Sequence, residues 1–421
     1  MTDRHPTPTI VPRRQASAGV PSVTDRAARH LVRTLARRIS SGTLTLEEGG
    51  RVLSFGSGEP HARVTVHDGR SYGAVARRGS LGLGQSYIDG WWDTDELTAL
   101  MRILARATST MGRVRDRMAR ATNPFGDPVR RLRRTSKAQD RLDIRAHYDI
   151  GNDFFALMLD PTMSYSCAVF ERPEATLEEA SVAKLDRICR KLSLSAADHV
   201  IEIGTGWGGF AVHAALRYGC RVTTTTISAE QYEYASKRVR DAGLADRVRV
   251  LHDDYRDLRG RFDKLVSVEM IEAIDWRQLG TFFRTCARLL RPEGLMALQA
   301  ITVADQSYER TKIARDFIKA FIFPGGCLPS IEAISRATAA TDMRIIDIED
   351  IGRHYAETLW RWRGNVDAHT SQIAALGLGP SFLRMWRFYL TYCEAGFLER
   401  QVSDVQILLA KPAWRPALAV R

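Results

Sequence analysis

The 421-residue sequence lacks long hydrophobic segments. It contains no run of about 18 apolar residues, the length that a helix needs to cross a bilayer. Its N-terminal residues also lack the apolar core of a secretion signal. We therefore expect a cytoplasmic chain without a membrane-spanning helix.

Cysteine is scarce, and its spacing carries no metal or redox motif. The six cysteines are Cys167, Cys189, Cys220, Cys286, Cys327 and Cys393. No pair has the spacing of zinc ligands or of a redox site, and a disulfide framework is atypical of so long a chain. We expect six reduced thiols and no bound metal.

Aromatic residues are nearly absent from the most basic part of the chain. The whole chain has a net charge of +12. Residues 113–145 hold eleven Arg or Lys against four Asp, and Phe125 is the only aromatic residue among them. Basic surfaces attract nucleic acid or anionic membrane. A single-stranded nucleic-acid site needs stacking rings, so nucleic acid is disfavoured. The segment is then either a solvated connector or a docking surface for anionic phospholipid headgroups, and both interpretations stay open.

The N-terminal part reads as a small α+β unit. Residues 24–39 have helical periodicity with Thr24 as a plausible cap, and they are rich in arginine. Three short strand patterns and a second amphipathic helix starting at Asp93 follow. The predicted organisation is a disordered tail at 1–22, an accessory domain at 23–112, a basic connector at 113–145 and a catalytic domain at 146–421.

From residue 146 onward, the sequence pattern predicts alternating strands and helices. This order predicts an α/β fold with a doubly wound, Rossmann-like sheet, which binds nucleotides at the carboxyl ends of its strands. Helices are predicted within 208–216, 228–243 and 276–294, the last one stopped by Pro292 and Gly294. Strands are predicted within 199–203, 220–228, 248–255, 263–274 and 295–303.

The string EIGTGWG, which begins at Glu202, is the candidate nucleotide turn. Gly204 and Gly206 permit a tight turn and a close ligand, and Gly209 completes a dinucleotide fingerprint. An NAD-dependent oxidoreductase is therefore an alternative. However, the next strand ends at Thr226 instead of a ribose-binding acid, and Glu202 would repel a pyrophosphate while suiting the amino-acid end of S-adenosylmethionine. The pattern favours a methyltransferase.

Asp254 and Tyr255 end the strand predicted within 248–255. A carboxylate at this place can accept a hydrogen bond from the adenine amino group, and its neighbour can flank the ring. An acid here could equally cap a turn, and the sequence does not decide between the two.

With these motifs in view, the chain resembles the cyclopropane-fatty-acid synthase family, which includes the mycolic acid cyclopropane synthases. The matching strings are AHYDIGNDFFALMLDPTMSYSCAVF (146–170), VIEIGTGWGGFA (200–211), TISAEQ (226–231), DDYRDL (253–258), SVEMIEAI (267–274), FIFPGG (321–326), HYAETLWRW (354–362), YCEAGF (392–397) and, more weakly, LGLGQSYIDGWW (81–92). The resemblance implies methyl transfer from S-adenosylmethionine to a cis alkene of a lipid acyl chain, through a carbocation that loses a proton.

The resemblance also implies a cofactor site. Tyr165 and Ser166 would contact the amino-acid end, together with Gly204, Thr205 and Gly206. Thr226 and Gln231 would lie near the ribose, with Asp254 and Tyr255 near adenine. Aromatic faces can stabilise the cation, or they can be ordinary core. The candidates are Tyr148, Phe154, Tyr165, Tyr355, Trp360 and Trp362.

Family members hold a bicarbonate ion as the base. Its implied ligands are Cys167, Glu272, the backbone of Ile301, and Tyr355. Cys393 matches a cysteine once proposed as catalytic, but a structural thiol is favoured because the reaction needs no covalent nucleophile.

Two residues depart from the family pattern. Gln299 stands where the bicarbonate site usually has a histidine, and Glu269 stands at a usually small residue in SVEMIEAI. One hypothesis is that Glu269 replaces or repositions bicarbonate as the base, since burial in a lipid pocket would raise its pKa. The alternative is that Glu269 pairs with an arginine or caps a turn.

With these two residues, the chain resembles the branch of the family that makes 10-methylene and 10-methyl fatty acids. A cyclopropane fatty acid is the alternative product. That branch implies a separate flavin-dependent reductase as partner. We expect an oleoyl phospholipid acceptor and a protein that lies on the inner face of the membrane, and the sequence leaves homo-oligomerisation open. A nucleic-acid methyltransferase is disfavoured, since neither an N/D-P-P-Y/F string nor a Pro-Cys loop occurs. A non-catalytic lipid-binding module is the remaining alternative.

Overall fold

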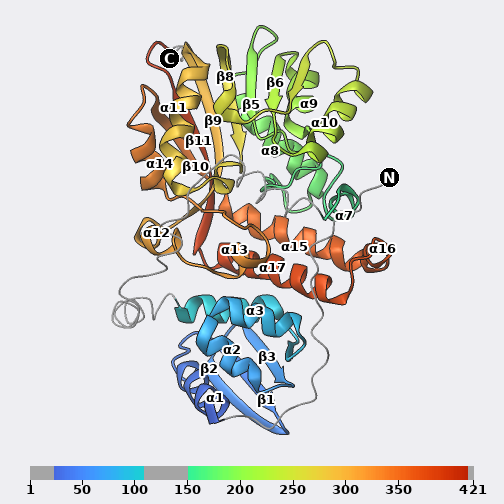
Figure 1. Ribbon diagram of the computed structural model, residues 1–421, viewed down its shortest axis with the longest axis vertical. Coiled ribbons are helices and arrows are strands. Elements are labelled where there is room, and N and C mark those ends of the chain that lie inside the picture. Colours follow the sequence, from blue (N-terminus) through green and yellow to red (C-terminus); the bar gives the residue numbers. More distant parts are fainter. Residues whose placement is uncertain (1–22, 109–149, 416–421) are drawn as a thin grey trace, which may run out of the picture.

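The computed structural model describes residues 23–108 and 150–415. Two β-sheets organise this part of the chain, one of four strands and one of seven (Figure 1). The predicted tail at 1–22 and basic connector at 113–145 lie outside the described residues, as does Tyr148.

The four-stranded sheet and its helices form the N-terminal α+β unit. Its elements are α1 (Val23–Ala36), β1 (Gly42–Glu48), β2 (Arg51–Ser57), β3 (His61–Val66), α2 (Arg70–Arg78), α3 (Ser80–Ile88) and β4 (Trp92–Thr94), and residues 97–108 are helical. The strand order is β2-β1-β3-β4, with β1 and β3 parallel. Alternate residues of β1 and β3, among them Leu44 and Val64, enter the core, as expected for a sheet with one covered face.

Two local predictions in this unit are wrong. Thr24 lies inside α1, which begins one residue earlier, so it is not the residue that precedes the helix. The helix expected from Asp93 begins at residue 97, because β4 pairs with β3 first. Asp93 instead belongs to that strand and hydrogen-bonds His67.

The seven-stranded sheet confirms the doubly wound prediction. Its strands are β5 (His199–Ile203), β6 (Arg221–Thr225), β7 (Val248–Leu251), β8 (Phe262–Val268), β9 (Leu290–Val303), β10 (Arg344–Asp350) and β11 (Val402–Ala410). The order is β10-β11-β9-β8-β5-β6-β7, and β11 runs antiparallel to both of its neighbours. The strand order reverses direction at β5, which is where such sheets bind ligands.

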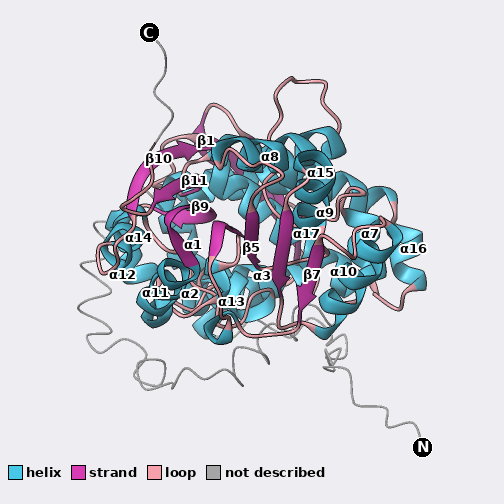
Figure 2. Ribbon diagram, turned by 90° about the horizontal axis from the view of Figure 1, so that it is seen from above, coloured by secondary structure: helices cyan, strands magenta, loops and turns pink. Residues whose placement is uncertain are grey.

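Helices cover both faces of this sheet (Figures 1 and 2). Val200 and Val222 pack with α8, α9 and α10, whereas Ile201 and Leu265 pack with α11 and α14. Neighbouring strand residues thus enter opposite cores, which explains the almost continuous apolar strands. The helices are α7 (Asn152–Met158), α8 (Leu177–Lys191), α9 (Gly209–Tyr218), α10 (Ala229–Asp241), α11 (Leu279–Leu289), α12 (Asp305–Thr311), α13 (Phe317–Phe321), α14 (Ile331–Thr338), α15 (Gly352–Ala368), α16 (Thr370–Ala375) and α17 (Pro380–Leu398).

The helix predicted within 276–294 ends earlier than expected, at Leu289. The chain enters β9 at Leu290, and Pro292 lies in that strand before its regular pairing resumes at Leu295. A proline is tolerated there because the ladder is irregular at this point.

The N-terminal unit packs against α17 and α13 through α3 (Figure 1). Gly84 of α3 makes this approach possible, since a Cβ there would lie 2.2 Å from the Phe317 ring. Ion pairs add to the contact: Glu399, which follows α17, accepts hydrogen bonds from Arg102 at 2.6 Å and from Arg106 at 2.7 Å. The two units therefore form one wall around the cavity described below.

None of the helices in residues 23–108 and 150–415 is long and apolar enough to cross a membrane. The longest of them, α17, has 19 residues but carries Arg384, Arg387 and Glu394.

Candidate active site

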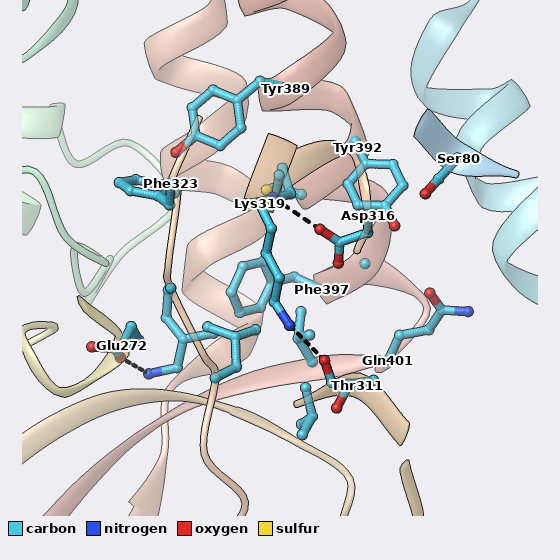
Figure 3. A pocket seen from close by; sticks show the side chains of 18 of the residues that line it. Ser80, Glu272, Thr311, Asp316, Lys319, Phe323, Tyr389, Tyr392, Phe397 and Gln401 are labelled. Atoms are coloured by element: carbon cyan, nitrogen blue, oxygen red, sulfur yellow. Dashed lines mark hydrogen bonds between the residues drawn. The ribbon is translucent and has the colours of Figure 1, made fainter. Parts of the chain in front are cut away.

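A cavity of about 1810 Å³ begins at the carboxyl ends of β5 and β6 and reaches the N-terminal unit. Its inner part is lined by the glycine turn, Glu202 and Glu269, and its outer part by α12, α13, α17 and α3. Figure 3 shows the outer part, with Glu272 on one side and Ser80 and Gln401 on the other. The cavity is large enough for a nucleotide and a long apolar ligand together.

The glycine turn lies between β5 and α9. Gly204 and Gly206 have φ angles of 104° and 52°, which residues with a Cβ rarely adopt. The amide nitrogens of Gly204 and Thr205 donate to the carbonyl of Thr225 at 3.0 Å each, which fixes the turn against β6. A Cβ on Gly209 would lie 2.7 Å from the Thr162 carbonyl oxygen, so this glycine serves packing.

Glu202 is the penultimate residue of β5, and its carboxylate is buried beside the turn. Thr224 donates to it at 2.6 Å, and the Thr205 hydroxyl lies 2.7 Å from that of Thr224. Burial raises the pKa of Glu202 to about 8. Thr205 thus supports Glu202 through Thr224. An incoming ammonium group would favour the ionised form of this carboxyl group.

Residues predicted near ribose and adenine line the same cavity. The Thr226 hydroxyl donates to Gln231 at 2.8 Å. Asp254 caps the short 3-10 helix Tyr255–Asp257 and accepts from the Arg256 guanidinium at 2.8 and 2.6 Å. The cap interpretation of Asp254 is confirmed, and β7 ends earlier, at Leu251. Roles at the ribose and adenine stay predictions.

Tyr165 and Ser166 approach the turn from a segment before α8. The Tyr165 hydroxyl lies 2.8 Å from that of Tyr389, and its ring centroid lies 5.2 Å from that of Trp362. Ser166 accepts a hydrogen bond from Lys184 of α8 at 2.8 Å. Both predicted residues line the cavity beside Glu202.

Glu269 is the centre of a buried hydrogen-bond cluster. Its Oε1 accepts from the backbone N–H of Cys167 at 2.7 Å and from the Gln299 amide at 2.8 Å. Its Oε2 accepts from the Tyr355 hydroxyl at 2.5 Å. These partners come from three segments far apart in sequence, and none is an arginine or a turn amide. The alternative interpretation of Glu269 is therefore wrong for the described part of the chain.

The backbone of Glu269 is left-handed, with a φ angle of 47°. This conformation costs a residue with a side chain about 1–2 kcal/mol. The resemblance places a small residue here, so the chain retains a conformation that suits glycine while carrying a glutamate. Such strain is typical of functional positions.

Burial raises the pKa of Glu269, while hydrogen bonds from Tyr355 and Cys167 oppose that rise. The Gln299 side-chain amide, which donates to Glu269, also donates to Asp404 of β11 at 3.0 Å. Burial and the nearby Glu269 raise the pKa of Asp404 well above its ordinary value. Two carboxyl groups this close favour one shared proton over two charges.

Glu272 points into the cavity one short turn after Glu269 (Figure 3). Its Oε1 accepts from the Ile301 N–H at 2.5 Å, and its buried Oε2 has no partner among the described residues. Burial and the neighbouring Glu269 raise the pKa of Glu272 to about 8. Glu272 thus offers an open hydrogen-bonding position on the cavity wall.

A separate bicarbonate ion does not fit this arrangement. The Cys167 N–H and the Tyr355 hydroxyl already bind Glu269, and the Ile301 N–H already binds Glu272. The Cys167 thiol contacts the carbonyl of Ala168 at 3.2 Å, and burial raises its pKa well above the ordinary value. Its backbone, not its sulfur, serves the cluster.

Aromatic side chains line the channel outward from this cluster (Figure 3). They are Tyr165, Tyr355, Phe323, Tyr389, Tyr392 and Phe397. The last four were missed by the sequence interpretation, although the strings FIFPGG and YCEAGF carry three of them. Trp360 was a wrong candidate, because it is 50% exposed, and Phe154 is packed among Phe382 and Trp386 instead of lining the cavity.

The six cysteines are free thiols, as predicted, and five are buried. Cys393 of α17 lines the cavity, but no hydrogen bond joins it to the cluster around Glu269 in the described structure. Burial raises its pKa, which keeps the thiol protonated. This environment favours a structural thiol.

The profile of the mycolic acid cyclopropane synthetase family matches residues 135–407, which is more than half of the chain. The chain belongs to this family. It is 37% identical over 406 residues to the tuberculostearic acid methyltransferase UfaA1 of Mycobacterium tuberculosis, covering 94% of this chain and 92% of that protein. It is also 36% identical to the cyclopropane-fatty-acyl-phospholipid synthase of Escherichia coli K12, covering 84% of this chain and 89% of the relative.

Solved structures of the cyclopropane synthetase family share the fold. The cyclopropane synthase MmaA2 of Mycobacterium tuberculosis aligns with a TM-score of 0.60 at 32% identity, covering 64% of this chain and 98% of the other. The mycolic acid cyclopropane synthase CmaA1, solved with SAH and CTAB, aligns with the same TM-score at 31% identity and the same coverage. The predicted Rossmann-like methyltransferase sheet is confirmed.

Membership of this family makes the protein an S-adenosylmethionine-dependent lipid methyltransferase, and the NAD-dependent alternative is wrong. The cavity fits this cofactor, because the glycine turn leaves room for a ligand and Glu202 offers a buried carboxyl group to an ammonium. The individual contacts of the predicted residues with the cofactor stay predictions.

Proposed function

We propose that the protein transfers a methyl group to the cis double bond of an oleoyl phospholipid chain and forms a 10-methylene product. The observation that carries the proposal is the carboxylate of Glu269, held by three donors in a buried cluster at the inner end of an apolar channel. The similarity to a protein named tuberculostearic acid methyltransferase supports this product.

An alkene is a weak nucleophile, so the reaction depends on placement and on exclusion of water. S-adenosylmethionine supplies an electrophilic methyl group on a positively charged sulfur. The aromatic channel would hold the acyl chain with its double bond near the glycine turn. Attack by one alkene carbon on this methyl group would form a carbon–carbon bond, break the methyl–sulfur bond and release neutral S-adenosylhomocysteine. The faces of Tyr165 and Tyr355 would stabilise the cation left on the neighbouring alkene carbon.

Formation of the methylene group then needs a base close to the new methyl group. A hydride shift moves the cation to the carbon that bears this methyl. Glu269 takes a proton from the methyl, and the released electron pair forms the exocyclic double bond. Glu269 can do so because it is buried without an ion-pair partner among the described residues and has a raised pKa.

In this proposal Glu269 replaces bicarbonate. A carboxylate has the same planar pair of oxygens, and here it binds two groups that the resemblance assigns to the ion, the Cys167 N–H and the Tyr355 hydroxyl. Gln299 complements the exchange, because its amide donates to Glu269 and its orientation is fixed by Gln406 and Asp404.

The first experiment incubates the protein with methyl-labelled S-adenosylmethionine and vesicles of dioleoyl phospholipid. We expect label in the acyl fraction as a C19 chain that takes up hydrogen under mild catalytic hydrogenation. A labelled chain that resists hydrogenation would be the cyclopropane isomer, which the similarity to the Escherichia coli enzyme keeps as the alternative. No acyl label with retained vesicle binding would support a lipid-binding module instead.

The acceptor bond lies in the middle of a bilayer, so the protein must reach it from the membrane surface. Arg26, Arg37 and Arg38 of the first helical segment are exposed and can contact anionic headgroups. Arg29 and Arg33 of the same arginine-rich segment instead pair with Glu48 at 2.8 and 2.7 Å. The expected signature is binding to anionic vesicles that weakens with salt; binding indifferent to salt would contradict it.

A methylene chain is also a substrate for reduction to a methyl branch. A separate flavin-dependent reductase is the expected consumer of the product. Adding such a reductase and its reduced cofactor to the labelled reaction should convert the hydrogenation-sensitive chain into a saturated one.

A further inference from the structure

Lys184 of α8 is a buried cation on the cavity wall whose role no motif assigns. Its side chain is 1% exposed, and it lines the cavity beside Ser166 and Glu202. Its ammonium group can donate three hydrogen bonds. Among the described residues it has one hydrogen-bond partner, the Ser166 hydroxyl at 2.8 Å, and no ion pair.

The carboxyl groups around Lys184 are already bound by neutral donors. Asp160 accepts from Thr162 and Ser181 at 2.9 Å each. Glu202 accepts from Thr224 at 2.6 Å, and Glu269 from its three donors. Burial lowers the pKa of Lys184, while the charges of Glu269 and Asp160 act on it without contact. Glu202 and Lys184 likewise interact only through their charges. An ammonium buried in this way is costly unless an anion meets it.

The cavity side is where such an anion can arrive. The methionyl end of S-adenosylmethionine is a zwitterion with one ammonium and one carboxylate. The wall presents a matching pair, because Glu202 and Lys184 lie on neighbouring elements, β5 and α8, and both line the space beside the glycine turn. Glu202 has the charge to meet the ammonium, and Lys184 has the charge to meet the carboxylate.

We propose that Lys184, oriented by Ser166, binds the carboxylate of the methionyl group of S-adenosylmethionine. This contact would make the protein select nucleosides that carry an intact amino acid. It would also fix the sulfur relative to the acyl channel, since both ends of the zwitterion are held. The proposal concerns the cofactor only and does not depend on which lipid is methylated.

Calorimetric titration with three ligands tests it: S-adenosylhomocysteine, its decarboxylated analogue and 5′-methylthioadenosine, which lacks the amino-acid moiety. Lys184→Met should weaken the binding of S-adenosylhomocysteine by about 10- to 100-fold, which corresponds to the loss of a hydrogen bond to a charged group. Affinity for the decarboxylated analogue and for methylthioadenosine should stay within about threefold of the wild type.

Two further variants complete the design. Lys191→Met removes a lysine from the same helix that pairs with Asp347 at 2.6 Å on the surface, and it should leave all three affinities unchanged. Lys184→Gln serves if the methionine variant fails to fold. An equal loss of affinity for S-adenosylhomocysteine and its decarboxylated analogue would mean a structural role and overturn the proposal. An unchanged affinity for S-adenosylhomocysteine would overturn it as well.

Discussion

At the scale of single residues, Glu269 stands where the sequence resemblance implies a small residue. A glutamate in a left-handed backbone conformation carries strain that a glycine would not. The strain is offset by three hydrogen bonds, all to one carboxylate. This combination is more easily explained by a reaction that needs a fixed base than by packing.

Two substitutions at Glu269 separate its roles. Glu269→Gln keeps the side-chain volume but cannot accept a proton, so turnover should fall by about 10²–10⁴-fold, the range for a lost general base. Glu269→Gly reopens the space and frees the Cys167 N–H and the Tyr355 hydroxyl, so added bicarbonate should restore part of its activity. Label incorporation into vesicle lipids, with and without bicarbonate, measures both effects.

The glutamine variant is the control for the glycine variant, because its amide still fills the site and should exclude the ion. Wild-type turnover in Glu269→Gln would show that another group takes the proton. Rescue of both variants to the same extent would show that bicarbonate acts elsewhere.

Tyr355 contacts the same carboxylate, which is the base in the proposed reaction. Its hydroxyl donates to Glu269 and lowers the pKa that burial raises. Tyr355→Phe should therefore raise that pKa further, because it removes a hydrogen bond that stabilises the ionised carboxylate. Because the ionised carboxylate is the active form, the acid limb of the pH–rate profile should move to higher pH.

The profile of kcat against pH for wild type and Tyr355→Phe checks this sign. Tyr389→Phe is a matched control, since it removes a hydroxyl that lies 2.8 Å from the Tyr165 hydroxyl. A shift of the acid limb to lower pH in Tyr355→Phe would be incompatible with an ionised Glu269 as the base.

At the scale of elements, the helical segment at 97–108 and α17 form the joint between the two sheets. Glu399 binds Arg102 and Arg106 with a side chain that is 12% exposed, and Glu394 of α17 binds Thr98 and Arg363. Ion pairs with so little solvent contact lose more when one partner is removed than surface pairs do. This joint holds the outer wall of the cavity.

Glu399→Gln should therefore lower the free energy of unfolding by about 1–3 kcal/mol, the range for hydrogen bonds to charged groups. Chemical denaturation measures the change. The exposed pair of Glu357 with Arg361 supplies the control, because Glu357→Gln should change stability by less than about 0.5 kcal/mol. Equal effects of the two variants would mean that the joint contributes no more than a surface pair.

At the scale of the whole molecule, a group of buried acids makes stability depend on pH in an unusual direction. Burial raises the pKa of both Glu202 and Glu272 from 4.5 to about 8. Between these values the folded protein binds more protons than the unfolded chain. Stability is therefore greatest below the unfolded pKa and is lost as pH rises toward the folded pKa.

The Tm of the ligand-free protein should accordingly fall from about pH 6 to about pH 8, between the unfolded and the folded pKa. The Tm of the Glu272→Gln variant should fall less over the same pH range, because one of the two carboxyl groups no longer titrates. Thermal unfolding of both proteins in a series of buffers measures the difference. A Tm that rises with pH in the wild type, or identical slopes in both, would contradict these raised pKa values.

The sequence by itself determined the parts of the protein that depend on local order. Alternation of apolar strands with amphipathic helices indicated the doubly wound sheet, and the spacing of Gly204 and Gly206 after a strand indicated the nucleotide turn. Helix and strand ends were less determined, as at Thr24 and Leu289, because pairing with a neighbouring strand decides where an element stops.

Only the tertiary structure decided the partners of the buried polar groups. Glu269 meets Cys167 and Tyr355 across more than 80 positions of chain, and Asp404 joins them from the last strand. No local pattern records such contacts, since they arise from the order of strands in the sheet. The sequence alone is equally compatible with a surface position for Lys184. In the folded protein, the orientation of α8 buries this side chain on the cavity wall.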